Sequence, residues 1–222
     1  MDDATREAVL ARILRFGLTT AEDVQLHVCN DVSLNAVRKL LAKLVESGWL
    51  NAYPLPERDK YFVAGKAAVL DHSLDPRKSS AFGPLALPTR IAMLTYCSRH
   101  AVIKPTAEEF KTQFTDFCRP GLSVTNYVYE TGDLFRIGWL LVDHGTEPKK
   151  VISKLRKVIR DRKGLPAFKA AMLKGEFFIS VLVPTDGRGE HLRRVYSKQP
   201  LRVIDVRFVT IPELLPLLVM EG

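Results

Sequence analysis

The sequence predicts an α/β fold, α+β overall, in which an N-terminal helical part precedes a C-terminal part built on a mixed sheet. Apolar residues recur at helical spacing through most of the first 48 residues. Beyond residue 125, strand-like runs of branched and aromatic residues alternate with amphipathic helices, which is typical of a sheet covered on both faces. A chain of 222 residues with 46% hydrophobic content can bury two modest cores, so we expect two domains.

Short apolar stripes indicate the first two helices. Thr20 is a capping residue that begins a second, short helix ending at Leu26. The first helix covers residues 4–16, and its apolar side consists of Ala8, Val9, Ala11, Ile13 and Leu14.

A third helix is predicted after Ser33, a favourable N-cap, and Gly48 is a favourable stop. Its apolar face is formed by Leu34, Val37, Leu40, Leu41, Leu44 and Val45. The opposite face carries Asn35, Arg38, Lys39, Lys43 and Glu46. One face is therefore expected to pack and the other to be available to DNA.

A β-hairpin is predicted after this helix. Residues 49–53 and 60–64 are strand-like, and residues 54–59 have the prolines and charges of an exposed turn. This places Arg58 and Lys60 near the hairpin tip.

Residues 4–64 resemble a winged helix-turn-helix domain of bacterial transcription regulators, and we assign residues 1–64 to that domain. The resemblance implies that the third helix enters the major groove of double-stranded DNA, while the hairpin tip touches backbone or minor groove. It implies DNA contacts by Ser33, Asn35, Arg38, Lys39 and Lys43, with Arg58 and Lys60 from the wing. Residues 1–64 hold eight Lys/Arg against nine Asp/Glu, so a protein docking module is the alternative.

Residues 65–84 are rich in small, polar and turn-forming residues and are predicted to be a linker, with a domain boundary near residue 80. A second domain is then expected over residues 85–222. Its predicted helices cover residues 85–99, a segment capped by Thr106, and residues 148–163, 166–173 and 188–196. Its predicted strands cover residues 125–130, 135–143, 177–183 and 201–209. The apolar run 211–220 is expected to pack on the core or on a second subunit.

The predicted helix 148–163 carries most of the positive charge. Residues 146–222 hold sixteen Lys/Arg against eight Asp/Glu, which accounts for the whole net charge of +8. Its apolar residues are expected to be buried, leaving a basic face at 149–163 that attracts phosphates without regard to sequence. The residues predicted on that face are Lys149, Lys150, Lys154, Arg156, Lys157 and Arg160. The alternative is an ordinary solvated helix face.

The order of elements after residue 85 resembles a restriction-endonuclease-like core, and together with the first domain it resembles the plasmid replication-relaxation family. That resemblance implies a metal-binding Glu-x-Asp at the strand end that reads Leu141, Val142, Asp143 here, followed by Gly-Thr-Glu. Leu141 stands where a carboxylate is expected, so the catalytic pattern is broken and we expect no enzyme activity. A vestigial nuclease site would consist of Glu130, Asp133 and Asp143, if these converge.

The same inspection excludes several classes of protein. No apolar run is long enough to span a membrane, and the start of the chain is acidic and amphipathic, which predicts a cytoplasmic protein without a membrane partner. Cys29, Cys97 and Cys118 lack a paired C-x-x-C, which argues against a disulfide framework or a zinc site. His144 is interpreted as a loop residue because no partner orients it as a base. We expect neither a metal nor another cofactor.

These observations lead to one hypothesis and two alternatives. The hypothesis is a non-enzymatic, dimeric regulator of transcription or of plasmid or phage replication, which reads double-stranded DNA with the winged helix and holds phosphates with the second domain. A homodimer is expected because one recognition helix reads only a few base pairs. The alternatives are a metal-dependent nuclease and a protein docking module.

Overall fold

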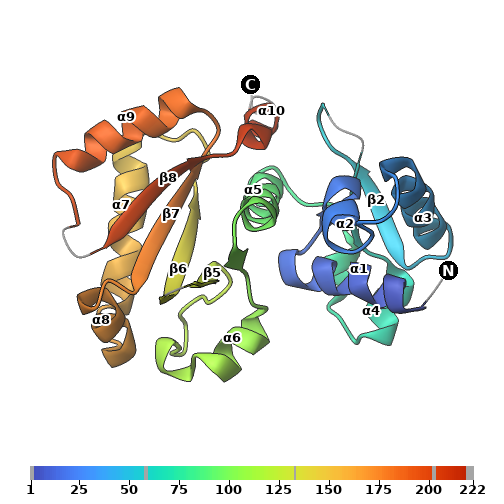
Figure 1. Ribbon diagram of the computed structural model, residues 1–222, viewed down its shortest axis with the longest axis horizontal. Helices are drawn as coiled ribbons and strands as arrows, with labels where there is room; N and C mark the ends of the chain where they lie inside the picture. Colours follow the sequence, from blue (N-terminus) through green and yellow to red (C-terminus); the bar gives the residue numbers. More distant parts are fainter. Residues whose placement is uncertain (1–2, 58–59, 133, 202–203, 219–222) are drawn as a thin grey trace. The chain divides into compact units, whose positions relative to one another are not determined.

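The computed structural model describes residues 3–57, 60–132, 134–201 and 204–218 (Figure 1). The chain divides into two compact units, Met1–Ser98 and Arg99–Gly222.

The first unit begins with the helices and the hairpin that the sequence predicts. In chain order they are α1 (Asp3–Phe16), β1 (Thr19–Thr20), α2 (Ala21–His27), α3 (Leu34–Glu46), β2 (Leu50–Pro54) and β3 (Lys60–Ala64). The sequence analysis missed β1, which pairs antiparallel with β3 to give a sheet of order β1-β3-β2. Two residues carry too little local pattern to predict such a strand.

Helix α3 ends at the residues that the sequence indicates. Ser33 caps its start, with the Oγ atom accepting a hydrogen bond from the Ala36 amide. Gly48 has φ +75° and its amide donates to Val45, while the Trp49 amide donates to Leu44. This pair of bonds is a Schellman motif, which satisfies the last carbonyls of the helix.

The core of the first unit lies between these helices and the hairpin. It includes the buried α3 residues Val37, Leu41 and Leu44. Burying one such leucine stabilises a fold by about 1.5–3 kcal/mol, so this face is committed to packing. Leu34, Leu40 and Val45 are only half-buried around this core.

The segment predicted to be a linker is instead folded. It contains α4 (Lys66–Asp71) and the 3-10 helix η1 (Pro76–Ser79), and it leads into α5 (Ala86–Arg99). The Ser79 carbonyl accepts hydrogen bonds from Asn51 Nδ2 (2.8 Å) and Tyr53 Oη (2.9 Å). The Phe82 amide donates to Tyr61 Oη at 3.1 Å. These contacts attach the segment to the hairpin, and the two units therefore meet near residue 98 rather than near residue 80.

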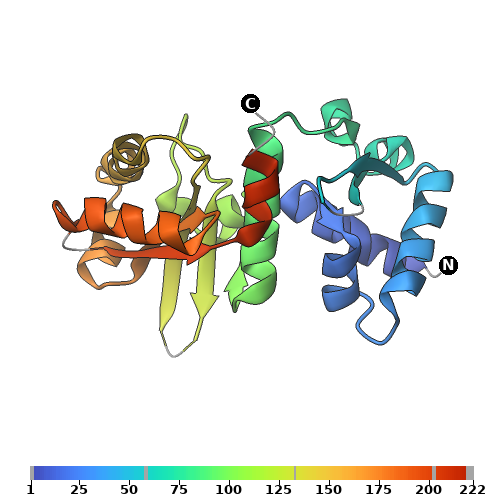
Figure 2. The same cartoon turned by 90° about the horizontal axis from the view of Figure 1, so that it is seen from above.

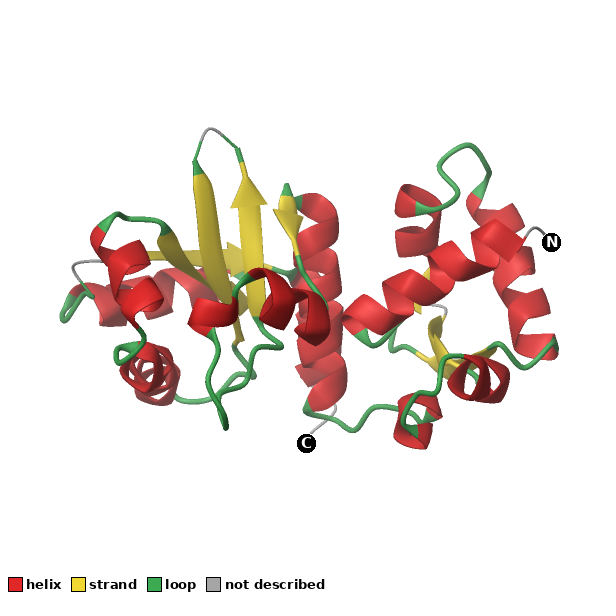
Figure 3. Ribbon diagram, turned by 90° about the horizontal axis from the view of Figure 1, so that it is seen from below, coloured by secondary structure: helices red, strands yellow, loops and turns green. Residues whose placement is uncertain are grey.

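The second unit is built on a mixed sheet of five strands, with the order β4-β5-β6-β7-β8 (Figure 3). The strands are β4 (Val102–Ile103), β5 (Tyr127–Thr131), β6 (Phe135–Val142), β7 (Phe177–Val183) and β8 (Asp205–Thr210). The first three are antiparallel, and β6, β7 and β8 are parallel. The sequence predicts four of them and misses the two-residue edge strand β4. β8 begins at Asp205, and residues 202–203 of the predicted strand 201–209 lie outside the described residues.

Helices connect and cover these strands. They are α6 (Ala107–Gln113), α7 (Pro148–Arg162), α8 (Pro166–Leu173), α9 (Asp186–Ser197) and α10 (Leu215–Leu218), with 3-10 turns η2 (Thr115–Phe117) and η3 (Pro212–Leu214). The helix capped by Thr106 is α6, and its capping box is complete. Figure 2 shows α9 running along β8. In the C-terminal run, Leu214 and Leu217 are buried, and the part from residue 219 onward lies outside the described residues.

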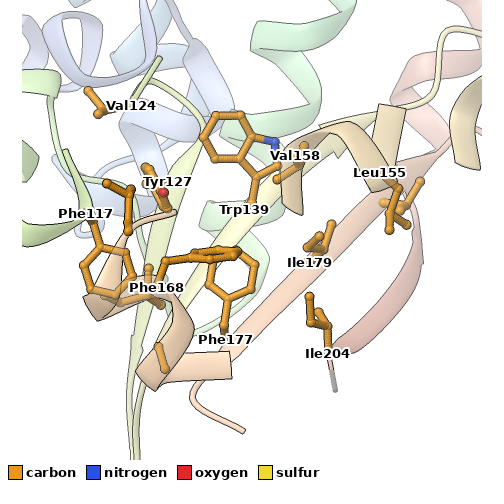
Figure 4. Close-up of a cluster of buried hydrophobic side chains, with 14 of the residues drawn as sticks. Phe117, Val124, Tyr127, Trp139, Leu155, Val158, Phe168, Phe177, Ile179 and Ile204 are labelled. Atoms are coloured by element: carbon orange, nitrogen blue, oxygen red, sulfur yellow. The ribbon is translucent and has the colours of Figure 1, made fainter. Parts of the chain in front are cut away.

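The core of the second unit packs α7 and α8 against one face of the sheet (Figure 4), and Leu192 of α9 belongs to the same cluster. All seven residues of β7 are buried, and this strand lies between its parallel neighbours β6 and β8. Gly138 on β6 has a specific reason to lack a side chain. A Cβ atom there would lie 2.2 Å from the ring of Phe178 on β7.

Two predicted exclusions, a membrane span and a disulfide framework, concern features that the described residues can show. Within them, no helix combines the length and the apolarity that a membrane crossing requires. No disulfide joins Cys29, Cys97 and Cys118, and each of the three has intermediate burial.

Candidate nucleic-acid interface

The polar face of α3 is exposed in the first unit. Asn35, Lys39 and Lys43 are exposed, as is Arg38, whose guanidinium lies 4.0 Å from Glu22 on α2. Ser33 is exposed too, although its hydroxyl is engaged as the helix cap. The predicted DNA-binding residues of this helix therefore share one solvent-facing side.

Two of the predicted DNA-binding residues, Arg58 and Lys60, belong to the predicted hairpin. Lys60 begins β3 and is exposed. Arg58 lies outside the described residues.

Helix α7 has the division of faces that the sequence predicts. Val151, Ile152, Leu155 and Val158 are buried, while Ile159 is half-buried. The predicted basic residues are all exposed: Lys149, Lys150, Lys154, Arg156, Lys157 and Arg160. Lys163, directly after the helix, is exposed as well.

Some of these cations are neutralised within the helix. Lys157 Nζ donates to Asp161 Oδ2 at 2.6 Å, and this hydrogen bond holds the pKa of Asp161 below its usual range. Lys150 Nζ lies 3.9 Å from Glu147. Arg156, in contrast, donates to the neutral side-chain oxygen of Gln199 at 2.7 Å and keeps its charge uncompensated there.

The last arginine of α7 has a different role. Arg162 is 3% exposed, with Nε donating to Tyr127 Oη at 2.8 Å and a terminal nitrogen donating to the Ser123 carbonyl at 3.0 Å. Its guanidinium lies 3.8 Å from the ring centroid of Trp139. Burial raises the pKa of the Tyr127 hydroxyl. Arg162 is therefore a core residue and is not available to a ligand.

Sequence reasoning missed Arg119, which reaches α7 from the loop after η2. Its side chain is exposed and donates to the Asp161 carbonyl at 2.7 Å. A separation of 42 residues explains why no local pattern indicates this contact.

Glu130 belongs to a network of charges at the sheet. It forms an ion pair with Arg207, whose Nε lies 2.8 Å from Asp205, and Arg136 donates to Asp205 at 3.0 Å. The Arg136 and Arg207 guanidinium groups both lie over the ring of Phe178. Glu130 is thus held by arginines, although its side chain is 22% exposed.

Asp143 is buried at the opposite end of β6 with a side chain that is 0% exposed. Arg188 from α9 donates to it through Nε at 2.6 Å and a terminal nitrogen at 3.2 Å, and the Gly145 amide donates at 3.1 Å. Arg188 also binds the Thr146 carbonyl. The sequence analysis missed Arg188, because its partner is 45 residues away.

Glu130 and Asp143 therefore do not converge, which a vestigial nuclease site would require. Glu130 pairs in register with Arg136 at the start of β6, whereas Asp143 follows the last residue of that strand. Seven residues of extended strand separate these points by roughly 23 Å, too far for a shared cation. Asp133 lies outside the described residues. The described part of the chain contains no group of three or more His, Cys, Asp or Glu side chains that could hold a metal ion.

Comparisons with known proteins add no family. No protein-family model, no curated protein and no solved structure matches the chain.

Proposed function

We propose that the protein is a non-enzymatic, DNA-binding regulator in which the first unit reads a site and α7 of the second unit holds phosphates. The exposed cationic face of α7 carries this proposal. The second unit has 21 Lys/Arg against 14 Asp/Glu, and its most concentrated cations lie on one side of one helix. Such a surface binds polyanions by releasing their counterions.

The element order of the first unit supports a winged helix within this proposal. Helix, strand, helix, helix and a two-stranded hairpin follow one another, and the first strand pairs with the last. In a winged helix the third helix is the one that enters the major groove. Asn35 and Arg38 have suitable chemistry for adenine and guanine edges.

The regulatory role and the dimer are also proposals. Regulation of transcription, or of plasmid or phage replication, would require a choice among many DNA sites. A single recognition helix reads only a few base pairs, and a symmetric pair on repeated half-sites raises both affinity and specificity.

Selection from a pool of random duplexes at a stated salt concentration tests the proposal. We expect enrichment of a motif with repeated half-sites, and Arg38→Ala should cost about 1–3 kcal/mol at one base position. Lys154→Ala is the matched control, because it should weaken all sequences alike. Retention of DNA without any motif would refute site-specific reading, and no retention would refute the proposal as a whole.

A protein docking module is the second candidate, favoured by the charge of the first unit. Residues 1–98 hold 12 Lys/Arg against 11 Asp/Glu, so this unit lacks the electropositive footprint of most DNA readers. The double variant Arg38→Ala/Lys39→Ala separates the two. Unchanged DNA affinity in that variant would favour docking.

A nuclease is not favoured by any contact in the structure. Asp143 is bound by Arg188, and Glu130 is bound by Arg207. Incubation of the purified protein with duplex DNA and magnesium or manganese should give no cleavage. Cleavage that Asp143→Ala abolishes would establish the nuclease.

A further inference from the structure

The cations of α7 fall into two rows along the helix. At 100° per residue, Lys149, Arg156, Arg160 and Lys163 lie within about 60° of one another, and we call them the first row. The second row, Lys150, Lys154 and Lys157, lies within another arc of about 60°, whose centre is roughly 120° further round. Both rows are exposed.

The acidic residues of this region lie on the side of the second row. Glu147 is 3.9 Å from Lys150, and Asp161 is 2.6 Å from Lys157. The second row thus contains three cations beside two carboxylates, and Arg119, attached at the Asp161 carbonyl, adds one more cation. A cation that already binds a carboxylate gains less from a phosphate, because the carboxylate must be displaced or repels the phosphate.

The first row is compensated less, because Asp161 attracts Arg160 only at longer range than it does Lys157. Among the described residues, no carboxylate oxygen lies within 4.0 Å of the side-chain nitrogens of its four members. Arg156 is oriented by the neutral Gln199 side chain and keeps its full charge. The row is roughly 21 Å long, which corresponds to the axial rise of about six nucleotides of one strand.

We propose that the first row, Lys149, Arg156, Arg160 and Lys163, is the surface of α7 that follows a nucleic-acid backbone, and that the second row contributes little. This inference rests on the proposed function and deepens it. It assigns Lys163 to the contact and reduces the role of Lys150 and Lys157. The occupant is the phosphate backbone of a DNA duplex, because a row of cations without a paired carboxylate among the described residues complements a row of phosphates.

Two triple variants of the full chain test this division, because they remove equal charge from the same helix. One is Lys149→Gln/Arg160→Gln/Lys163→Gln, and the matched control is Lys150→Gln/Lys154→Gln/Lys157→Gln. The affinity of each for one random-sequence duplex is measured between 50 and 200 mM salt, where each phosphate contact contributes about 0.9 to the slope of log K against log salt. The slope should decrease by about 2.7 in the first-row variant, which loses three phosphate contacts. It should decrease by about 0.9 in the control, where only Lys154 is expected to contact a phosphate.

The outcomes separate this inference from the proposed function. Equal slope losses in the two variants overturn the division into rows while leaving DNA binding in place. A wild-type protein that does not bind the duplex overturns the proposed function itself. Vesicles containing phosphatidylserine are the second probe, and a first-row variant that loses vesicle binding but not DNA binding overturns the choice of occupant.

Folding is checked by thermal denaturation of both variants. If a triple variant does not fold, the pair Arg160→Gln and Lys157→Gln replaces it. The expected slope losses are then about 0.9 for Arg160→Gln and near zero for Lys157→Gln, and the reverse order overturns the inference.

Discussion

Replacing Arg162 with alanine should test how the second unit holds a buried cation without a carboxylate. The substitution removes the donors from Tyr127 Oη at 2.8 Å and from the Ser123 carbonyl at 3.0 Å. Two acceptors that lose their donors cost about 1–3 kcal/mol each. The lost stacking on Trp139 adds about 1–2 kcal/mol. The variant also lacks the cost of removing a guanidinium from water, which offsets part of this sum, so we expect a net loss of about 3 kcal/mol.

The assay is urea denaturation followed by fluorescence of Trp139, in a Trp49→Phe background so that only the second unit reports. With an m value of about 1.5 kcal/mol/M, the midpoint should fall by about 2 M. Arg160→Ala is the control on the exposed face of the same helix, and it should change stability by less than about 0.5 kcal/mol. A loss below about 1 kcal/mol for Arg162→Ala would refute the reasoning, because the buried hydrogen bonds would then contribute almost nothing.

Two further predictions concern the other charged groups. Asp143→Asn should destabilise the second unit by about 3–5 kcal/mol, because it leaves Arg188 unpaired. Adding Arg188→Met should recover part of that loss in a double-mutant cycle measured by denaturation. Additive losses from the two substitutions would contradict the pairing. His27 has its pKa lowered by burial and then by Arg12, so its neutral form is favoured in the fold. The unfolded chain then takes up the proton first, and stability of the first unit should fall as the pH drops below about 6.5. His27→Gln should flatten that part of the curve of stability against pH, and an unchanged curve would assign the pH dependence to other groups.

Local sequence patterns are sufficient to predict α3, α7 and β7. The apolar spacing of α3 and α7, with Ser33 and Pro148 at their starts, predicts both helices to within one or two residues. The strand Phe177–Val183 is predicted at its observed bounds, because a short continuous run of branched and aromatic residues is typical of a buried strand. The exposed basic residues of α7 follow from the same periodicity.

Contacts between distant residues explain what the sequence analysis missed. β1 and β4 are two residues long and exist because of their partners, Phe62 and Tyr61 for β1 and Glu130 and Tyr129 for β4. The segment 65–84 is predicted to be a linker because it is rich in small, polar and turn-forming residues, yet its backbone at Ser79 and Phe82 binds side chains of the hairpin. Tertiary hydrogen bonds of this kind leave no period in the sequence.

Contacts between distant residues also determine the surroundings of the charged side chains, and they change how the acidic residues are interpreted. A carboxylate near a strand end suggests a metal ligand until its neighbours are known. Burying Asp143 without a counter-charge would cost several kcal/mol, and Arg188 removes that cost through two hydrogen bonds. A metal ion at Asp143 would have to displace this arginine and would find no second carboxylate from Glu130, which is held by Arg207 at the other end of β6. Asp143 and Glu130 are thus both paired with arginines. The cations of the first row of α7, in contrast, form no ion pair with a described carboxylate. This distribution of charge favours our proposal of a polyanionic ligand over a metal-dependent reaction.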